Sequence, residues 1–299
     1  MDRLAVGLVS RTYFNIPLWI AQQQGFFAAE NLAVDGTIFG NASQERPLLD
    51  GTFQFYIGSP EAVMQNAAAG GPLRIVAGNC GRLVHWLIAR APFARVEDLR
   101  GGTIGIFNFK EGTFFHVRTM LAAHGLNYPG DYKVVETGGG VPPRHQALLA
   151  GTIDAGLQSM PWNYVAEEAG MRNLGDVTDH VPDWQFVSIN ANDRWAAANR
   201  DKVVRFLRAM LRATEWLYAH RAEASAIAAR ELPAPLPQAE RAWDFFTGTN
   251  ALTRDMSVNV KGLSKVRDTL IESGLLPKDA PAGPAFYVND AYLREACMG

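Results

Sequence analysis

The sequence contains little cysteine, almost no excess charge and no long apolar run. Its two cysteines, Cys80 and Cys297, lie far apart and outside any CxxC pair, so no zinc or dithiol redox motif is present. The formal net charge of -2 argues against binding to nucleic acid or to an anionic membrane. No run of about 18 apolar residues occurs, which argues against a membrane-spanning helix. We expect two free thiols; a disulfide between them is the alternative.

Common catalytic and metal-binding motifs are also missing. The six histidines are scattered and none pairs with a glutamate at the helical spacing of zinc sites. No GxSxG nucleophile motif occurs. Gly138-Gly139-Gly140 lacks the GK[ST] ending of a phosphate loop and the Rossmann spacing, so we interpret it as room for close approach of the backbone. We therefore expect no catalytic residue, no metal and no cofactor.

The start of the chain leaves two localisations open. No basic segment followed by an apolar one precedes the first predicted strand, although a secretion leader has that form. We expect a periplasmic protein if a leader was removed, and a cytoplasmic protein if Met1 is the native start.

Two stretches about a hundred residues apart share one pattern. Residues 48–60 and 148–161 each read as a helix end, a glycine, a short apolar strand, a serine and a proline. Gly51 and Gly151 suit the left-handed backbone that closes a helix, and proline suits the start of the next helix. Further echoes flank both stretches, and 299 residues exceed one typical domain. The repeat therefore predicts two similar α/β lobes.

Apolar runs alternate with helical patterns along most of the chain. We expect the run at 83–89 to cross from the first lobe to the second, and the run at 184–189 to return. Lobe 1 would then comprise residues 1–87 and 190–299, and lobe 2 residues 88–189. From residue 199 onward, apolar residues recur at helical spacing. We predict strands at residues 3–9, 37–39, 53–57, 73–77, 83–89, 103–107, 134–136, 153–157 and 184–189.

Several segments resemble those of one known family, in the same order. Residues 16–27 resemble the opening of solute-binding proteins of the nitrate, sulfonate and taurine class. That class of ABC-transporter proteins merges in sequence with the NMT1/THI5-like binding proteins. Residues 98–105 and 148–161 resemble its "DLKGKKIGV" and "ALxxGxxDAxxxxxP" segments, and residues 192–206 and 287–296 resemble its later helix and its C-terminal tail.

This resemblance implies a fold, a function and partners. The fold is the type II periplasmic-binding-protein fold, in which two α/β lobes joined by two crossing strands close on a small ligand. The function is that of the solute-binding component of an ABC importer, with permease and ATPase subunits as partners. The ligand would be a small anionic or aromatic organic molecule. We expect a monomer that is not an enzyme and does not bind nucleic acid.

Two other functions stay open. One is a cytosolic enzyme of the same fold, similar to a thiamine-pyrimidine synthase, a decarboxylase or a dehydratase. The other is a ligand-sensing domain of a regulator. It is less well supported, because no DNA-binding segment is present.

Candidate binding residues lie in the loops that follow the predicted strands. Ligands of open α/β sheets bind beyond the carboxyl ends of the strands, where helix N-termini favour anionic or polar groups. Aromatic side chains there suit a flat ligand, and cationic ones suit a carboxylate or a sulfonate. We predict ligand contacts from Arg11, Thr12, Tyr13, Phe14, Asn41, Ser59, Asn79, His85, Trp86, Asn108, Lys110, Thr113, Gly138, Gln158 and Trp162.

Each candidate also has a purely structural interpretation. The rings can belong to the core, and the polar loop residues can cap helices or form turns. Arg82 and Arg144 are further cationic candidates, but a loop arginine is commonly solvated. Arg11 and Lys110 occupy equivalent places in the two halves, which favours both. Glu61 could meet a cationic ligand, although a glutamate in the first turn also suits the helix dipole.

Overall fold

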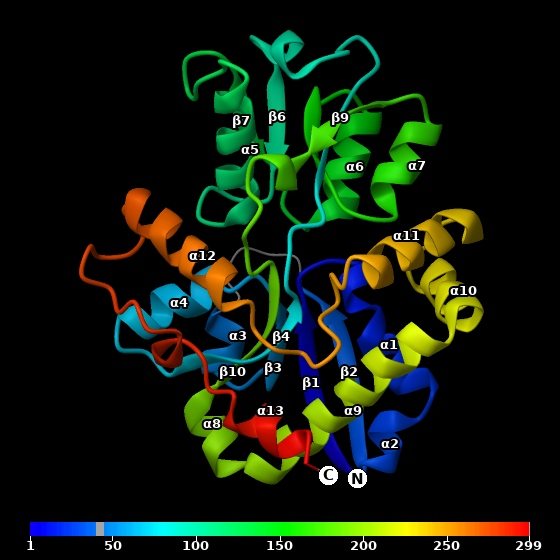
Figure 1. The fold of residues 1–299 in the computed structure, drawn as a ribbon, viewed down its shortest axis with the longest axis vertical. Coiled ribbons are helices and arrows are strands. Elements are labelled where there is room, and N and C mark those ends of the chain that lie inside the picture. Colours follow the sequence, from blue (N-terminus) through cyan, green and yellow to red (C-terminus); the bar gives the residue numbers. More distant parts are fainter. Residues whose placement is uncertain (40–44, 299) are drawn as a thin grey trace.

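The computed structural model describes residues 1–39 and 45–298 and divides the chain into two lobes (Figure 1). Each lobe is built on one five-stranded sheet covered by helices. The predicted fold class, two α/β lobes that face each other, is therefore confirmed. Asn41, one of the predicted site residues, lies outside the described residues.

Lobe 1 is built on a mixed sheet in the order β2-β1-β3-β10-β4. β1 pairs in parallel with β2 and β3, whereas β10 runs antiparallel to β3 and β4. The connecting segments form short helices, as the alternation of apolar strands and helical patterns predicts. The strands are β1 (Asp2–Leu8), β2 (Leu32–Ile38), β3 (Phe55–Gly58), β4 (Leu73–Cys80) and β10 (Val187–Asn192), and the helices α1 (Ile16–Gln23), α2 (Phe26–Ala29), α3 (Glu45–Leu49) and α4 (Glu61–Ala68).

Lobe 2 repeats this arrangement with the order β7-β6-β8-β5-β9. β6 pairs in parallel with β7 and β8, and β5 runs antiparallel to β8 and β9. β9 was not predicted, because this short edge strand of polar residues lacks an apolar alternation. The elements are β5 (Trp86–Ala89), β6 (Thr103–Ile106), β7 (Lys133–Glu136), β8 (Ala155–Gln158), β9 (Arg172–Asp176), α5 (Gly112–Ala123), α6 (Val141–Leu149) and α7 (Trp162–Glu168).

The chain crosses between the lobes at residues 81–85 and 177–186. β5 belongs entirely to the sheet of lobe 2 and β10 entirely to that of lobe 1, so the expected boundaries at 87/88 and 189/190 fall inside strands. The crossings themselves are largely irregular and are not the predicted strands. The apolar residues that suggested strands there are Leu83, Val84 and Trp184. They are buried in the crossings without pairing in a sheet.

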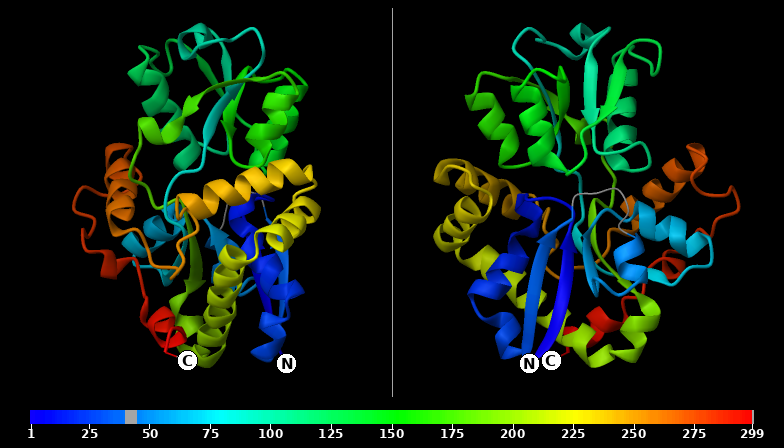
Figure 2. Two further views of the ribbon diagram at one scale, coloured as in Figure 1. Left: turned by 45° about the vertical axis from the view of Figure 1, so that its right-hand side comes forward. Right: turned by 180° about the vertical axis from the view of Figure 1, so that it is seen from behind.

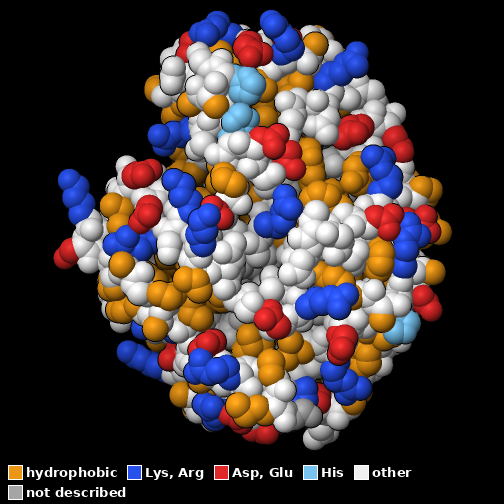
Figure 3. Space-filling view, viewed as in Figure 1, with side chains coloured by type: hydrophobic (Ala, Val, Ile, Leu, Met, Phe, Trp, Pro, Cys, Tyr) orange, Lys and Arg blue, Asp and Glu red, His pale blue; other side chains and the backbone are white. Residues whose placement is uncertain are grey.

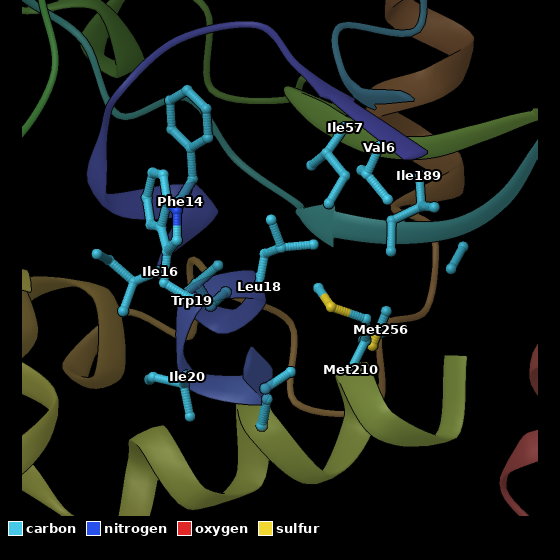
Figure 4. Close-up of a cluster of buried hydrophobic side chains, with 14 of the residues drawn as sticks. Val6, Phe14, Ile16, Leu18, Trp19, Ile20, Ile57, Ile189, Met210 and Met256 are labelled. Carbon is cyan, nitrogen blue, oxygen red and sulfur yellow. The ribbon is translucent and has the colours of Figure 1, made fainter. Parts of the chain in front are cut away.

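Helices that follow β10 complete lobe 1 and flank lobe 2. On α9, Phe206 stacks on Phe55 of β3 with ring centroids 4.1 Å apart. Figure 4 shows Val6, Ile57 and Ile189, from three adjacent strands, pointing toward Met210 of α9 and Met256. In Figure 2, α11 and α12 rise toward lobe 2 on opposite sides of the molecule. These helices are α8 (Asp193–Ala198), α9 (Arg200–Ala219), α10 (Arg221–Glu231), α11 (Leu236–Gly248), α12 (Val260–Glu272) and α13 (Ala291–Ala296).

The structure bears on the two expectations about free thiols and membrane-spanning helices. Cys80 is buried, Cys297 is exposed, and both are free. Burial raises the pKa of the Cys80 thiol to about 12, so this thiol stays protonated at neutral pH. Among the helices within residues 1–39 and 45–298, none combines the length and the hydropathy needed to cross a bilayer.

Candidate functional site

A cavity of about 40 Å³ lies between the two lobes. Residues just past the carboxyl ends of β1, β3 and β6 line it, which is where ligands of such sheets bind. Its volume allows no more than a few water molecules, so the lobes are nearly closed on each other. The lining residues are Val9, Ser10, Phe14, Ser59, His85, Phe107, Glu111, Thr113, Gly140, Val141, Arg144, Phe186 and Val187.

Arg144 places a buried cation at the wall of this cavity. Its residue is 1% exposed, and its Nε donates a hydrogen bond to the carbonyl of Leu157 at 2.6 Å. Its Nη1 has no partner among residues 1–39 and 45–298. Burial lowers the pKa of Arg144 to about 10, which leaves the guanidinium charged at neutral pH. A buried charge with an unfilled donor calls for an anionic partner.

Two glycines make room for this arginine. Gly105 on β6 and Gly156 on β8 are paired neighbours in the sheet. A Cβ atom at Gly156 would lie 2.9 Å from Cδ of Arg144, and one at Gly105 would lie 3.4 Å from its Cγ. The side chain of Arg144 therefore lies across the sheet where two strands carry no side chain.

Two carboxyl groups, one from each lobe, lie near each other beside the cavity, and that of Glu111 lines it. Glu61 begins α4 in lobe 1, and its Oε1 accepts a hydrogen bond from the N–H of Gly112 in lobe 2 at 3.0 Å. Glu111 directly precedes α5 and accepts from the hydroxyl of Thr113 at 3.2 Å. Burial raises the pKa of Glu61 to about 7. Burial, and then the nearby Glu61, raise the pKa of Glu111 to about 8, so this pair holds a proton at neutral pH.

Two buried histidines lie beside the cavity in their neutral form. Burial lowers the pKa of His116 to about 3 and that of His85 well below its usual value, which Arg144 lowers further. Within the described ranges, Nδ1 of His85 and both ring nitrogens of His116 lack a hydrogen-bond partner. Across the part of the chain that the structure describes, no three His, Cys, Asp or Glu side chains gather as a metal site.

A second contact between the lobes lies at the start of α7. The indole N–H of Trp162 donates to the carbonyl of Arg11 at 3.1 Å, and the N–H of Tyr13 donates to the carbonyl of Met160 at 3.3 Å. Thr12 and Gln158 are fully buried there, and their side-chain polar atoms have no partner in the described part of the chain. Each unpaired buried group costs about 1–3 kcal/mol, so the closed arrangement without ligand is destabilised by these groups.

The structure gathers some of the predicted site residues and disperses others. Phe14, Ser59, His85 and Thr113 line the cavity. Thr12, Tyr13, Gln158 and Trp162 belong to the second contact, although Tyr13 also stacks on Phe246 in the core of lobe 1.

The remaining predicted residues have structural roles outside the cavity lining. Asn79 donates to the carbonyl of Phe14 at 2.8 Å, and the Asn108 side chain accepts from the N–H of Lys110 in an exposed turn. Trp86 packs edge-on against Phe245. Lys110 is exposed.

Arg11 and Gly138 also lie outside the cavity lining. The side chain of Arg11 is 41% exposed and pairs with Glu231 of α10 at 3.5 Å. An added Cβ at Gly138 would meet no described atom within 4 Å. Gly140, two residues later, lines the cavity in its place.

Several lining residues were not among the predicted contacts. The hydroxyl of Ser10 accepts a hydrogen bond from the N–H of Val141 at the start of α6, 3.2 Å away. Glu111, Gly140, Arg144 and Phe186 also belong to this group. Arg144 is nevertheless one of the further cationic candidates named from the sequence, and glycines inside predicted strands mark a close approach of another group.

Comparison with known proteins gives a family and a fold. The family model described as NMT1/THI5 like matches residues 14–224, as the resemblance predicts. No curated protein matches the sequence. The periplasmic nitrate-binding protein NrtA from Synechocystis PCC 6803 is 14% identical over 100% of this chain and 89% of its own, with a TM-score of 0.82.

Two further solved structures share the fold. The alkanesulfonate-binding protein SsuA from Xanthomonas axonopodis pv. citri, bound to MOPS, is 19% identical over 97% of this chain and 98% of its own, with a TM-score of 0.77. The desulfurization enzyme DSZB is 15% identical over 100% of this chain and 99% of its own, with a TM-score of 0.71. The fold therefore serves both binding proteins and an enzyme, and function must be argued from the site.

Proposed function

Since this chain belongs to the NMT1/THI5-like family, we propose that it is the solute-binding component of an ABC importer. It binds one small anionic organic solute between its lobes. The observation that carries this proposal is the buried guanidinium of Arg144, with an unfilled donor among the described residues, at a cavity that both lobes line. Permease and ATPase subunits are its proposed partners, and the proposed location is the periplasm, where such a component works as a monomer.

The chemistry of the cavity favours an anion attached to an apolar or aromatic body. Arg144 offers a donor that suits one oxygen of a carboxylate or a sulfonate. A protonated Glu111 also donates a hydrogen bond, and the N-terminus of α6 favours negative charge. Phe14, Phe107 and Phe186 supply apolar walls that suit the rest of the solute.

Solute entry requires the lobes to separate. A cavity of about 40 Å³ is too small for an organic anion, so the closed lobes must open at the crossings at 81–85 and 177–186. A solute then stabilises the closed arrangement to the extent that it fits that arrangement better than the open one.

An enzyme on the same fold is the second candidate. The carboxyl pair of Glu61 and Glu111 and the neutral His85 are groups that transfer protons in water-poor sites, which favours this alternative. The described residues that line the cavity include no cysteine, so they offer no thiol as a nucleophile. An enzyme would return its ligand chemically changed, whereas a binding protein would return it intact.

A ligand screen tests the proposed function. Thermal unfolding is measured with alkanesulfonates, arylsulfonates, carboxylates and their neutral amides. Anions are expected to raise the unfolding temperature, since a ligand at a hundredfold excess over Kd stabilises by about 2.7 kcal/mol. Mass spectrometry of the ligand after release is expected to find it unchanged; a converted ligand would establish the enzyme instead.

Arg144→Gln is the critical variant in this screen, with Lys110→Gln as its control. Arg144→Gln is expected to lose anion binding while circular dichroism shows a folded protein. Lys110→Gln removes an exposed cation outside the cavity and is expected to bind as the unaltered protein does. The proposal fails if the neutral amides bind as tightly as the anions. It also fails if Arg144→Gln binds the anions as tightly as the unaltered protein does.

A further inference from the structure

A second and larger cavity, of about 330 Å³, lies between α5 of lobe 2 and α12 of lobe 1. We call it the α5–α12 groove. No described residue lines both this groove and the interlobe cavity. Figure 1 shows α12 beside the lobe that carries α5, and Figure 3 shows hydrophobic and basic side chains adjoining where the lobes meet on that side. The lining residues are Phe115, His116, Arg118, Thr119, Ala122, Asn127, Tyr128, His180, Val181, Trp184, Lys265, Thr269, Glu272 and Ser273.

The crossing segment separates the two cavities. Trp184 faces the groove and Phe186, two residues later, faces the interlobe cavity. His116 packs edge-on against Trp184, with ring centroids 4.6 Å apart. The groove therefore lies on the far side of a crossing from the solute cavity.

The floor of the groove is aromatic and its rim is basic. Phe115 and Trp184 are 4% and 2% exposed, whereas Arg118 and Lys265 stand exposed at the rim. Neither of these two cations forms an ion pair with a carboxylate in the chain as described, 1–39 and 45–298. Glu272 is the acidic residue among the described lining, so the lining carries an excess of positive charge.

We propose that the α5–α12 groove is a second ligand site, which takes a small aromatic carboxylate. Its volume lies at the lower end of the range of about 300–1,000 Å³ typical of small-molecule sites. The ring of such a ligand stacks on Tyr128, which is 38% exposed, and its carboxylate pairs with Lys265 and Arg118. The guanidinium carbon of Arg118 lies 5.3 Å from the ring centroid of Phe114.

The groove is physically joined to the interlobe cavity through α5. The first turn of this helix meets the interlobe site at Thr113, and its next turns line the groove at His116 and Thr119. A ligand in the groove touches both lobes, so its affinity depends on how the lobes are placed. The groove exists with the lobes nearly closed, and by linkage its ligand therefore raises the affinity of the interlobe solute. This coupling, unlike the groove site itself, depends on the proposed function.

Benzoate is the probe that tests the site, with binding measured by calorimetry. Benzoate is expected to bind the unaltered protein, and Thr269→Trp, which fills the groove, is expected to weaken binding at least tenfold. Lys265→Gln, a surface change on α12, is expected to weaken it several-fold, whereas Lys133→Gln on β7 leaves it unchanged. Circular dichroism checks that Thr269→Trp is folded, and Lys265→Gln tests the site if it is not.

Arg144→Gln separates this proposal from the proposed function. It disables the interlobe site and is expected to leave benzoate binding at the groove intact. The second site is overturned if benzoate does not bind, or if Arg144→Gln abolishes its binding while Thr269→Trp does not. In the latter case benzoate occupies the interlobe cavity.

The coupling has its own measurement. The affinity for the best sulfonate of the screen is measured with and without saturating benzoate. It is expected to rise several-fold in the unaltered protein and to stay constant in Thr269→Trp. If the sulfonate affinity of the unaltered protein does not change or falls when benzoate is added, the coupling is overturned. The groove site is then judged by the benzoate binding experiment alone.

Discussion

At the scale of single residues, the interlobe cavity depends on charges that folding has removed from water. Arg144 and Glu111 both line a cavity with aromatic walls, and Glu61 of the other lobe lies near Glu111, where it accepts from the N–H of Gly112. A buried carboxyl that keeps its proton avoids the cost of a buried negative charge. Below about pH 7 both carboxyl groups are largely protonated, so they leave the positive charge of Arg144 uncompensated, which is the condition that favours an anionic solute.

The raised pKa values of this pair predict a fall in stability between pH 6.5 and 8. Glu61 and Glu111 titrate near 7 and 8 when folded but near 4.3 when unfolded. The folded state therefore binds more protons in this interval, and stability present at low pH is lost as the pH rises. We expect the free energy of unfolding, measured by urea titration, to fall by on the order of 1 kcal/mol.

Histidines do not interfere in this interval. The pKa values of His85 and His116 are lowered by burial, so these residues increase stability with pH only up to about 6.5. Glu61→Gln keeps an acceptor for the N–H of Gly112 and is expected to reduce the fall, whereas the burial of Glu111 keeps part of it. Glu223→Gln, an exposed change on α10, is expected to keep it. An unaltered protein with constant stability from pH 6.5 to 8 would contradict this account.

At the scale of elements, the start of α6 shows how a helix can meet the opposite lobe. Gly140 has φ +80°, and a Cβ atom there would lie 2.6 Å from Oγ of Ser10 in lobe 1. Gly138 also has positive φ, +61°, but its Cβ would contact no described atom. The same substitution at these two positions therefore separates backbone strain from contact between the lobes.

We expect Gly140→Ala to weaken solute binding at least tenfold and Gly138→Ala to leave it nearly unchanged. Both changes strain a left-handed backbone and lower stability by about 1 kcal/mol or more. Only the first places an atom where the lobes must close. Affinity from calorimetry and unfolding temperature, measured on both variants, check this. Equal loss of affinity in the two would show that strain alone matters.

The order of elements could largely be predicted from the sequence, because local patterns decide it. The echo between residues 48–60 and 148–161 corresponds to α3-β3-α4 and α6-β8-α7, which occupy equivalent places in the two sheets. Glycine stops and apolar periodicity lie within a few residues of the elements they shape. β9 escaped prediction because its edge position demands no apolar face.

The candidate site was less predictable, because its contacts depend on distant parts of the chain. Arg11 and Lys110 are equivalent in the repeat, but Arg11 pairs with Glu231 on α10, a helix that the repeat does not include. Arg144 enters the cavity because Gly105 and Gly156 become neighbours in the sheet. Pairings between segments about 50 to 220 residues apart leave no local signal of which residues will meet.

At the scale of the whole molecule, the two lobes must part and close at the crossings. The closed arrangement encloses unpaired polar groups at the second interlobe contact, since no described residue partners the side chains of Thr12 and Gln158. Opening exposes these groups to water and recovers their hydrogen bonds. We infer that the unliganded protein is open in solution and that a solute closes it.

Two tryptophans with matched hydrogen bonds test this inference. The indole of Trp162 donates to the carbonyl of Arg11 across the lobes at 3.1 Å, whereas that of Trp243 donates to the carbonyl of Leu217 within lobe 1 at 2.8 Å. Substitution by phenylalanine removes one such bond in each case, worth about 1 kcal/mol. Only the bond of Trp243 exists in both the open and the closed protein.

Trp243→Phe is therefore expected to lower the unfolding temperature of the unliganded protein by about 2–4 °C without changing solute affinity. Trp162→Phe is expected to leave that temperature unchanged and to weaken solute binding about fivefold. Small-angle scattering is expected to show a decrease in the radius of gyration when solute is added. If Trp162→Phe destabilises the unliganded protein as much as Trp243→Phe does, the lobes are closed without solute, and closure is not what the solute brings about.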